Sequence, residues 1–243
     1  SRRVHCVFHL ASYGVSRNET VQAARADKVN IDGTCNVLNA CPYHGVKTRQ
    51  YVSTYNVVFV REPIVNGNEV LPDFPIEDHV DAYARNKSIA EPLVLTSTDR
   101  QTKSDKGSRL YTCSIRPAAI YGPREDRHLP RILSLANLGL PFFAIVDPNV
   151  NSNWVYVDNL DLALILTSMR LLNDIPDRNG IPVPAGQAYF ICDGSPVNTF
   201  EFLTPLFQNL HYPLPRIIMY TSLALAISTF FALMYTLLYP CLD

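Results

Sequence analysis

The chain has 243 residues, of which 47% are hydrophobic, and its net charge is −1. This length is enough to bury a sizeable core, as one large domain or as a domain with an appendage. The nearly balanced charge and the lack of any Lys/Arg run leave no basic surface for nucleic-acid phosphates, so we expect no nucleic-acid partner.

Six cysteines are scattered along the chain, without a Cys-x-x-Cys pair or a cluster of cysteine and histidine. This spacing lacks the ligand pattern of a zinc site or a disulfide framework. We therefore expect reduced thiols, mostly buried as small hydrophobic side chains, and no bound metal.

Strand-like and helix-like segments alternate along most of the chain, an order that predicts a parallel sheet covered by helices. Strands are predicted at 4–10, 51–53, 110–116, 154–157 and 189–192, and helices over 18–41, around 83–87, and over 129–138, 158–172 and 199–210. Asp158 is the predicted cap of its helix. Pro117 is expected to end the third strand, before a turn at Gly122-Pro123.

Residues 217–239 carry no charge. A membrane-spanning helix needs about 20 predominantly apolar residues, so we expect membrane association through this segment. Several Ser and Thr residues dilute its apolar character. A helix packed on the domain or lying in the membrane interface therefore remains an alternative to a spanning helix.

Tyr83 and Lys87 stand four residues apart, which places them one above the other on a helix face. A lysine ammonium beside a phenol favours the phenolate, and this makes the tyrosine a better proton-transfer group near neutral pH. Such a pair also occurs by chance on solvated helix faces, so its neighbours in the sequence decide its meaning.

Several short sequence motifs lie before and after this pair. They are VFHLAS at 7–12, NIDGTCNVL at 30–38, YVST at 51–54, NKSIAE at 86–91, RPAAIYG at 116–122, RHLPR at 127–131 and VYVDNL at 155–160. In this order they resemble the extended short-chain dehydrogenases/reductases. Within that group the chain is most similar to the 3β-hydroxysteroid dehydrogenase/isomerase family, and there to family 42E.

The resemblance implies an α/β fold with a Rossmann-like, doubly wound parallel sheet that binds NAD, with NADP as the alternative. It also implies oxidation of a CH–OH group in a sterol or steroid by a membrane enzyme of the endoplasmic reticulum whose catalytic domain faces the cytosol. Related enzymes often pair through the helix that carries the tyrosine and lysine, so a homodimer is expected. Whether an isomerase step follows stays open.

The resemblance also implies roles for individual residues. Tyr83 would be the general acid/base, and Lys87 would hold the nicotinamide ribose and lower the tyrosine pKa. Thr54, or Ser53 beside it, would hydrogen-bond the reacting oxygen, and Asn30 would help to order a proton-relay water. The remaining cofactor-binding residues implied are Leu10, Ala11, Ser12, Pro117 and Ile120.

The chain departs from the family in lacking the Gly-rich turn that holds the pyrophosphate, since no G-x-x-G-x-x-G occurs in it. We expect a longer parent protein to supply that segment. The predicted divisions are a partial Rossmann core at 1–125, further Rossmann elements with the substrate region at 126–215, and the hydrophobic helix at 216–243. Pro92 is expected to disturb the catalytic helix only beyond Lys87.

Two other functions compete with a sterol oxidoreductase. A nucleotide-sugar epimerase or dehydratase would use the same fold, but such enzymes tend to carry an aromatic-Asn pair where this chain has Pro117-Ala118. A truncated isoform or pseudoenzyme would keep the Tyr/Lys pair without binding cofactor. A titration with NAD(H) and NADP(H) separates this last alternative from an active enzyme.

Overall fold

The structure is a computed structural model that describes most of the chain. The described residues are 4–14, 23–59, 64–72, 74–79, 81–103, 108–126, 129–137, 143–145, 150–172, 181–212, 217–219 and 221–238. The chain forms two compact units, one from Ser1–Arg124 with Asn153–Ser195 and the other from Glu125–Ser152 with Pro196–Asp243. Each unit is discontinuous in sequence, because the chain leaves the first unit after Arg124 and returns to it at Asn153.

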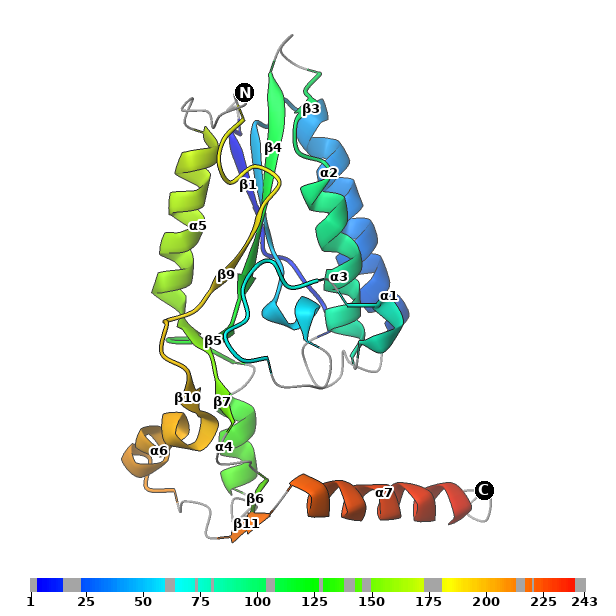
Figure 1. The fold of residues 1–243 in the computed structure, drawn as a ribbon, viewed down its shortest axis with the longest axis vertical. Helices are drawn as coiled ribbons and strands as arrows, with labels where there is room; N and C mark the ends of the chain where they lie inside the picture. The colour runs from blue at the N-terminus through cyan, green and yellow to red at the C-terminus, as the bar shows by residue number, and fades with distance from the viewer. Residues whose placement is uncertain are drawn as a thin grey trace. The chain divides into compact units, whose positions relative to one another are not determined.

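A parallel sheet forms the centre of the first unit (Figure 1). Its strands follow the spatial order β1 (Cys6–His9), β2 (Thr48–Val52), β4 (Arg109–Pro117) and β9 (Ala188–Ile191). The short β3 (Arg100–Gln101) pairs antiparallel with the start of β4. β1 has β2 as its only partner among the described strands, so its other edge is open there.

Helices cover both faces of this sheet, which confirms the predicted doubly wound arrangement (Figure 1). One face carries α1 (Ala23–Asp27), the π-helical turn η1 (Lys28–Asp32), α2 (Gly33–Tyr43) and α3 (Ala82–Leu95). The other face carries α5 (Val157–Leu172), whose Leu160, Leu164 and Leu171 pack with residues of β4. Tyr51 of β2 instead packs with Leu38 of α2 and with α3.

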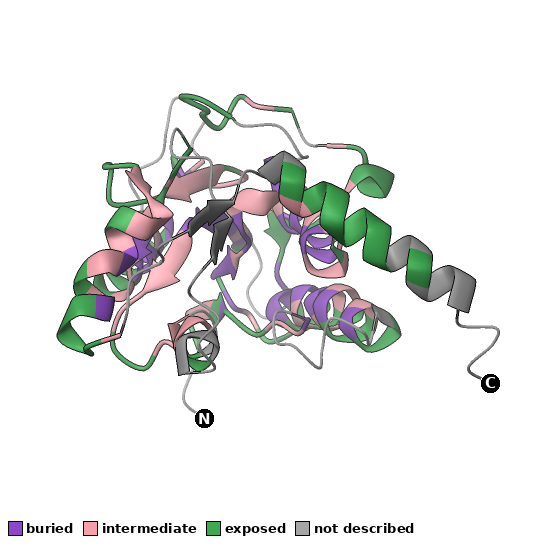
Figure 2. Ribbon diagram, turned by 90° about the horizontal axis from the view of Figure 1, so that it is seen from below, coloured by how far each residue is buried: buried purple, intermediate pink, exposed green. Residues whose placement is uncertain are grey.

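The burial of the central strands follows from these two helical layers (Figure 2). Strands covered on both faces are usually runs of Val, Ile and Leu. β4 partly follows this rule, and Cys113 is an inert member of its core, as expected. β2 departs from it, because Thr48, Arg49 and Gln50 are all fully buried. Gln50 is satisfied by donating from Nε2 to the carbonyl of Leu164, at 2.7 Å.

Shorter elements complete the first unit near the carboxyl ends of its strands. β5 (Ala119–Tyr121) pairs in parallel with β8 (Trp154–Tyr156), and η2 (Tyr55–Val58) and η3 (Ile76–Asp78) are 3₁₀ turns. α5 begins at Val157, so Asp158 lies in its first turn and the prediction that Asp158 precedes the helix as its cap is wrong. The preceding strand runs directly into the helix and leaves no separate cap residue.

The second unit contains α4 (Leu129–Asn137), β6 (Phe143–Ile145), β7 (Asn151–Ser152), β10 (Val197–Asn198), α6 (Thr199–Asn209), β11 (Ile217–Met219) and α7 (Thr221–Leu238). Leu203 and Phe207 of α6 form its core with Leu129 and Ile132 of α4. Asn198 caps α6 by accepting the N–H of Phe200 at 3.0 Å.

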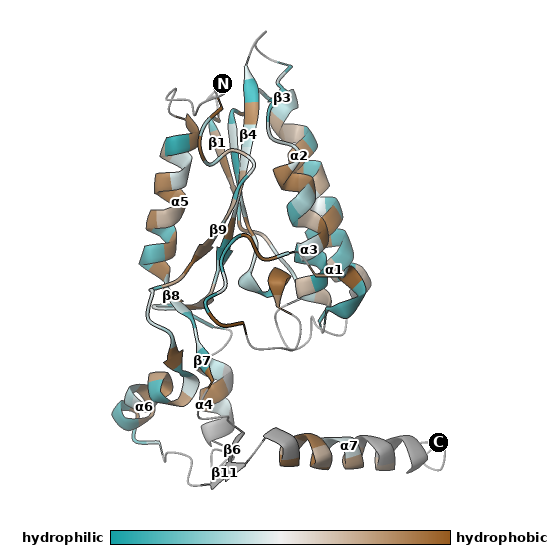
Figure 3. Ribbon diagram, in the orientation of Figure 1, coloured by the Kyte–Doolittle hydropathy of each residue, from teal (hydrophilic) through white to brown (hydrophobic). Residues whose placement is uncertain are grey.

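The hydrophobic tail differs from the spanning helix that the sequence suggested. Its first residues, Ile217–Met219, pair with β6, and α7 itself has 18 residues. A helix of that length rises about 27 Å, less than the ~30 Å hydrocarbon core of a bilayer. Among the described residues, no helix is both long and apolar enough to cross a membrane. α7 is nevertheless strongly hydrophobic along the part coloured in Figure 3.

Candidate active site

The carboxyl ends of three adjacent parallel strands gather many of the residues singled out in the sequence. These are Leu10–Ser12 after β1, Ser53–Thr54 after β2, and Pro117 at the end of β4. Parallel strands present their carboxyl ends at one edge of the sheet, and open α/β sheets bind their ligands at that edge. The candidate site therefore lies where this fold class places its ligands.

Helix α3 brings Tyr83 and Lys87 to the same edge. Asp81 starts the helix by accepting the N–H of Ala84 on Oδ1, at 2.8 Å. Tyr83 is half-buried in the first turn, and Lys87 follows one turn later with only 1% of its surface exposed. The Lys87 ammonium donates to the carbonyl of Val52, the last residue of β2, with an Nζ–O distance of 2.7 Å.

The Lys87 ammonium lies near two phenol rings. Its Nζ is 4.5 Å from the ring centroid of Tyr51 and 5.7 Å from that of Tyr83. Burial raises the pKa of Tyr51 well above its ordinary value, so this phenol stays neutral. For Tyr83, a buried cation nearby would favour the ionised form. Pro92 lies within α3, which continues to Leu95, and both Tyr83 and Lys87 precede it.

The hydroxyls of Ser53 and Thr54 have different environments. Thr54 Oγ1 accepts the N–H of Asn56 at 3.3 Å and so caps η2, which leaves the hydroxyl proton available for donation. Ser53 is 1% exposed, and its Oγ has no hydrogen-bond partner among the described residues. An unpaired buried hydroxyl destabilises the fold, and such groups call for a functional or solvent explanation.

Asn30 lies in η1, and π-helical turns often mark functional sites. Its side chain is engaged with the backbone of Tyr13, since Oδ1 accepts the N–H at 2.8 Å and Nδ2 donates to the carbonyl at 2.7 Å. The Asn30 carbonyl accepts the Thr34 hydroxyl at 2.6 Å. Asn30 thus fixes the segment after β1, while its amide is already occupied.

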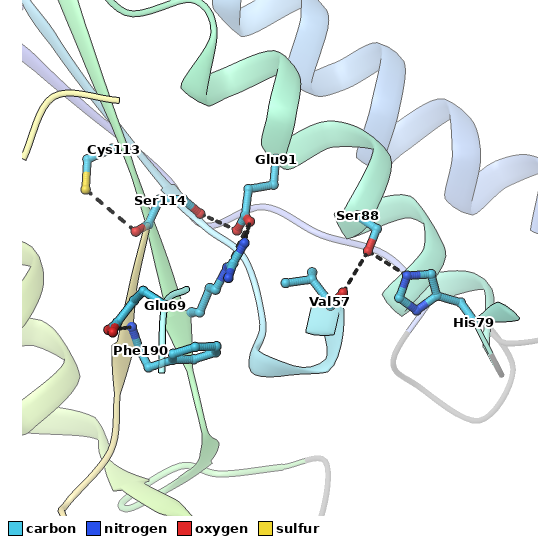
Figure 4. Close-up of polar contacts among 9 residues, drawn as sticks. Val57, Glu69, His79, Ser88, Glu91, Cys113, Ser114 and Phe190 are labelled. Atoms are coloured by element: carbon cyan, nitrogen blue, oxygen red, sulfur yellow. Dashed lines mark hydrogen bonds and ion pairs between the residues drawn. The ribbon is translucent and has the colours of Figure 1, made fainter. Parts of the chain in front are cut away.

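A buried ion pair that sequence reasoning missed holds α3 against β4. Glu91 accepts from Arg116 Nε at 2.8 Å and from Arg116 Nη2 on Oε1, and from the Ser114 hydroxyl at 2.6 Å on Oε2 (Figure 4). Both charged side chains are almost completely buried. Glu91 stands one turn after Lys87 on the inner face of α3. A carboxylate on the side of the helix that faces the sheet could have indicated a buried ion pair.

Further contacts extend this network on both sides (Figure 4). The Arg116 guanidinium lies 5.4 Å from the ring centroid of Phe190 on β9, and the Phe190 N–H donates to Glu69 at 3.0 Å. Ser88 of α3 donates from Oγ to the carbonyl of Val57 at 3.4 Å, and its Oγ is 2.7 Å from His79 Nε2. The loop before α3 is therefore attached both to the edge strand β9 and to α3.

A second buried cation, Arg49, lies near Tyr51, with its Cζ atom 5.7 Å from the ring centroid. Arg49 is fully buried, its Nη2 contacts Nδ1 of His9, and its Nε and Nη1 have no hydrogen-bond partner among the described residues. Burial lowers the pKa of Arg49 to about 10. Burial, helped by the charges of Arg49 and Lys87, lowers the pKa of His9 to about 4, so His9 is neutral at pH 7.

The described residues fit one end of a nicotinamide dinucleotide. Lys87 lies beside the end of β2, and the half-exposed Leu10 with Ala11 leaves backbone accessible at the end of β1. Pro117 is buried in the pairing with β9, and Ile120 is partly exposed on β5. The sequence has no Gly-rich turn for the pyrophosphate. The role of Lys87 as the group that holds the nicotinamide ribose stays a prediction, and the sequence contains no candidate turn for the phosphates.

A sequence model described as the 3-beta hydroxysteroid dehydrogenase/isomerase family matches residues 1–224. The chain belongs to this family. Short-chain dehydrogenase/reductase family 42E member 1 of Danio rerio is 46% identical over 216 residues, which cover 89% of this chain and 54% of that relative. The Arabidopsis thaliana protein named 3beta-hydroxysteroid-dehydrogenase/decarboxylase isoform 1 is 34% identical over 236 residues, covering 96% and 50%. The chain thus spans about half the length of these relatives.

Several solved structures share the fold of this family member. The crystal structure of gox2253 superposes with a TM-score of 0.71 at 19% identity, covering 96% of this chain and 63% of that one. MoeE5 in complex with UDP-glucuronic acid and NAD gives 0.65 at 22% identity, covering 90% and 66%. The predicted Rossmann-like fold is therefore confirmed.

Proposed function

We propose that this chain is the catalytic portion of an NAD(P)-dependent oxidoreductase that acts on the CH–OH group of a sterol-like alcohol. The observation that carries the proposal is the position of Lys87, which is buried, bonded to the end of β2 beside Thr54, and one turn from Tyr83. A tyrosine, a cation and a hydroxyl at the ligand-binding edge of a parallel sheet suit proton transfer to or from a carbinol oxygen.

In the proposed reaction a bound nicotinamide supplies the hydride acceptor or donor. Tyr83 takes the proton of the substrate hydroxyl during oxidation, and the Lys87 charge favours its phenolate form. Thr54 donates a hydrogen bond from its hydroxyl to the reacting oxygen. It can do so because the hydroxyl is the acceptor in its contact with Asn56. A positioned acid/base of this kind typically contributes 10²–10⁴-fold to the rate, about 3–5 kcal/mol of barrier.

Two observations support the choice of cofactor and substrate. The structural relatives include MoeE5 with NAD and RMD from Pseudomonas aeruginosa with NADPH, the latter with a TM-score of 0.61 at 23% identity, covering 90% of this chain and 70% of that one. The Arabidopsis thaliana relative is named for a 3beta-hydroxysteroid. Several of the structural relatives are nucleotide-sugar enzymes, but Pro117-Ala118 departs from the aromatic-Asn pair typical of epimerases, so we favour the sterol.

The proposal also places the protein at a membrane, as suits a lipid substrate, with the first unit on the cytosolic side of the endoplasmic reticulum. The apolar, exposed side chains of α7 support an interfacial position of that helix. Flotation with phosphatidylcholine vesicles tests this part. We expect the chain to float and the Leu225→Glu/Phe230→Glu variant to remain in the dense fraction; equal flotation of both would contradict the role of α7.

A thermal-shift titration with NAD⁺, NADH, NADP⁺ and NADPH tests cofactor binding. A ligand at 100 times its dissociation constant should add about 2.7 kcal/mol of stability. A shift with one pair of cofactors would support the proposal, and sterol oxidation would then be measured by the absorbance of the reduced nicotinamide. If none of the four binds, either to this chain or to a longer protein that contains it, the proposed oxidoreductase function is wrong.

A further inference from the structure

A cavity of about 500 Å³ opens between the C-terminal end of α2 and the short strand β3. Helix α2 ends at Tyr43, shortly before β2 begins at Thr48, so the cavity lies at the amino ends of the parallel strands (Figure 1). The candidate active site occupies their carboxyl ends, where Lys87 bonds to Val52. Small-molecule sites typically enclose roughly 300–1,000 Å³. This cavity is therefore large enough for a small ligand and is separate from the candidate catalytic residues.

The polar side chains around this cavity are basic groups and amides, beside one phenol ring. The basic residues are His44, Arg100 and Lys103, the amides are Asn39 and Gln101, and the phenol is Tyr43. Among the described residues, no aspartate or glutamate lines the cavity, and neither Arg100 nor Lys103 forms an ion pair. Positive charge without a counter-charge attracts anionic ligands.

The carboxylate that precedes Arg100 in the sequence is already neutralised. Asp99 pairs with Arg109, at a distance of 2.7 Å between Oδ2 and Nη1. The Asp99 carbonyl also accepts from the same guanidinium, at 3.1 Å. Asp99 is thus engaged with β4, and Arg100 keeps its full charge for a ligand.

The end of α2 does not oppose an anion through open carbonyl groups. Carbonyls at a helix C-terminus carry partial negative charge and repel anions where they are unsatisfied. Here the carbonyls of Ala40, Cys41 and Pro42 all accept backbone N–H groups. The N–H that reaches Pro42 belongs to Lys103, at 2.9 Å, so this bond also fixes the two walls of the cavity to each other.

Tyr43 and Lys103 are already arranged beside each other at the cavity. The Lys103 ammonium lies 5.4 Å from the centroid of the Tyr43 ring, which in turn meets the His44 ring edge-on at 5.1 Å. The Tyr43 side chain is 63% exposed. Groups that are positioned before binding lose less conformational entropy when a ligand arrives. An exposed aromatic ring also offers a surface on which a flat group can stack.

We propose that this cavity binds a phosphate monoester, with Arg100 and Lys103 on the phosphate oxygens and the Tyr43 ring against the group that carries the phosphate. A guanidinium fits two phosphate oxygens at once, and a lysine adds a compact charge. The amides of Asn39 and Gln101 would bond to further oxygens of the ligand. The inference does not rest on the proposed function, because the cavity lies at the opposite ends of the strands from Lys87.

Titrations followed by the NMR shifts of backbone amides test the site. The probes are inorganic phosphate and adenosine monophosphate, and we expect saturable shifts at 43–45 and 100–103. The Arg100→Gln/Lys103→Gln variant should bind at least tenfold more weakly. The control variant Lys47→Gln/Arg170→Gln removes the same charge from exposed positions that do not line the cavity, and it should bind like the unchanged chain.

Two sources of a phosphate monoester, a soluble nucleotide and the headgroup of phosphatidic acid, are separated by flotation with vesicles. For a lipid ligand, equimolar phosphatidic acid and phosphatidylcholine should float more of the chain than phosphatidylcholine alone. That excess should vanish in Arg100→Gln/Lys103→Gln and persist in the control. For a soluble ligand there should be no excess, and adenosine monophosphate should bind more tightly than inorganic phosphate until Tyr43→Ala removes the difference.

Circular dichroism of each variant checks that these exposed substitutions leave the fold intact. The inference is overturned if inorganic phosphate, adenosine monophosphate and phosphatidic acid all fail to bind saturably. It is also overturned if the control variant loses as much binding as Arg100→Gln/Lys103→Gln, or if neither variant loses any. Shifts confined to 10–12, at the carboxyl ends of the strands, would contradict it as well, since the ligand would then occupy the candidate active site.

Discussion

Buried cations dominate the chemistry of this chain at the level of single residues. Lys87 and Arg49 both lie near the Tyr51 ring, at 4.5 and 5.7 Å from its centroid, and both are almost fully buried. Lys87 was recognised in the sequence from its spacing to Tyr83. The burial of Arg49 was not recognised, because a charged residue within a strand gives no local sign of burial; only the pairing of β1, β2 and β4 shows it.

Replacing Tyr83 with Phe separates proton transfer from cofactor binding. In the form of the protein that binds cofactor, kcat should fall about 10²–10⁴-fold, since the acid/base is lost while the ring remains. The dissociation constant of NAD(H), measured by fluorescence titration, should stay within about twofold. Lys87→Ala should weaken both, because Lys87 is proposed to hold the ribose. Parallel loss of rate and cofactor affinity in Tyr83→Phe would reject the acid/base assignment.

The stability of the fold should fall in weak acid because of His9. Its pKa is about 4 in the folded chain and about 6.5 when unfolded, so above pH 6.5 both states are neutral. Between pH 6.5 and pH 4 the unfolded state binds the proton more tightly. The free energy of unfolding should therefore drop by about 3 kcal/mol across this window.

Urea denaturation of the unchanged chain and of His9→Gln at pH 7 and pH 4 isolates that contribution. Glutamine keeps a group able to accept from Arg49 but does not titrate. The drop between the two pH values should be about 3 kcal/mol smaller in the variant. An identical pH dependence would show that His9 is not buried in neutral form.

At the level of elements, α3 carries the candidate chemistry and is fixed at several points. Asp81 caps its start, Lys87 ties it to β2, and Glu91 ties it to β4. Alternating strand and helix patterns predicted α3 and the four parallel strands. They did not predict the π-helical break at Lys28–Asp32, which interrupts the expected helix over 18–41, because helical periodicity is the same on both sides of such a turn. The short pairs β5–β8 and β7–β10 depend on contacts distant in sequence.

Glu91→Gln should destabilise the first unit by about 3–5 kcal/mol, because it leaves the buried Arg116 guanidinium without a counter-charge. The matched control is Arg109→Met, which breaks the exposed pair with Asp99, whose side chains are 50% and 39% exposed. That change should cost less than about 1 kcal/mol. Chemical denaturation measures both.

The double variant Glu91→Met/Arg116→Met provides a further check. Replacing both buried charges with apolar side chains of similar volume should recover most of the stability lost in Glu91→Gln. A double variant no more stable than the single one would show that Glu91 acts through something other than its pairing with Arg116.

At the scale of the whole molecule, the fold class could be predicted from the order of strands and helices along the sequence. The family could be predicted from short sequence motifs such as YVST at 51–54. The interleaving of the two units could not be predicted, because it depends on the chain leaving the first unit at Arg124 and returning at Asn153. The roles proposed for Tyr83, Lys87 and Thr54 stay predictions, with a geometry that supports them.

The rate of amide hydrogen exchange in each strand of the first unit should depend on how many strands and helices cover it. β4 is paired on both sides and covered by helices on both faces, so its amides should exchange slowest. Amides of β1, at the open edge, should exchange at least tenfold faster. Mass spectrometry of peptides covering 6–9 and 109–117 measures both rates. Equal protection of the two strands would indicate that β1 is already covered in the isolated chain.

The open edge of β1 and the apolar outer side of α5, formed by the exposed Leu162, Ile165, Leu166 and Met169, also bear on the fate of the chain in a cell. Unpaired strand edges and apolar stripes are the features by which holdase chaperones and degradation machinery distinguish unfinished proteins from finished ones. A chain that displays both would be retained by chaperones and turned over quickly until they are covered. Its steady-state abundance would then depend on how fast these surfaces are covered more directly than on its own rate of synthesis.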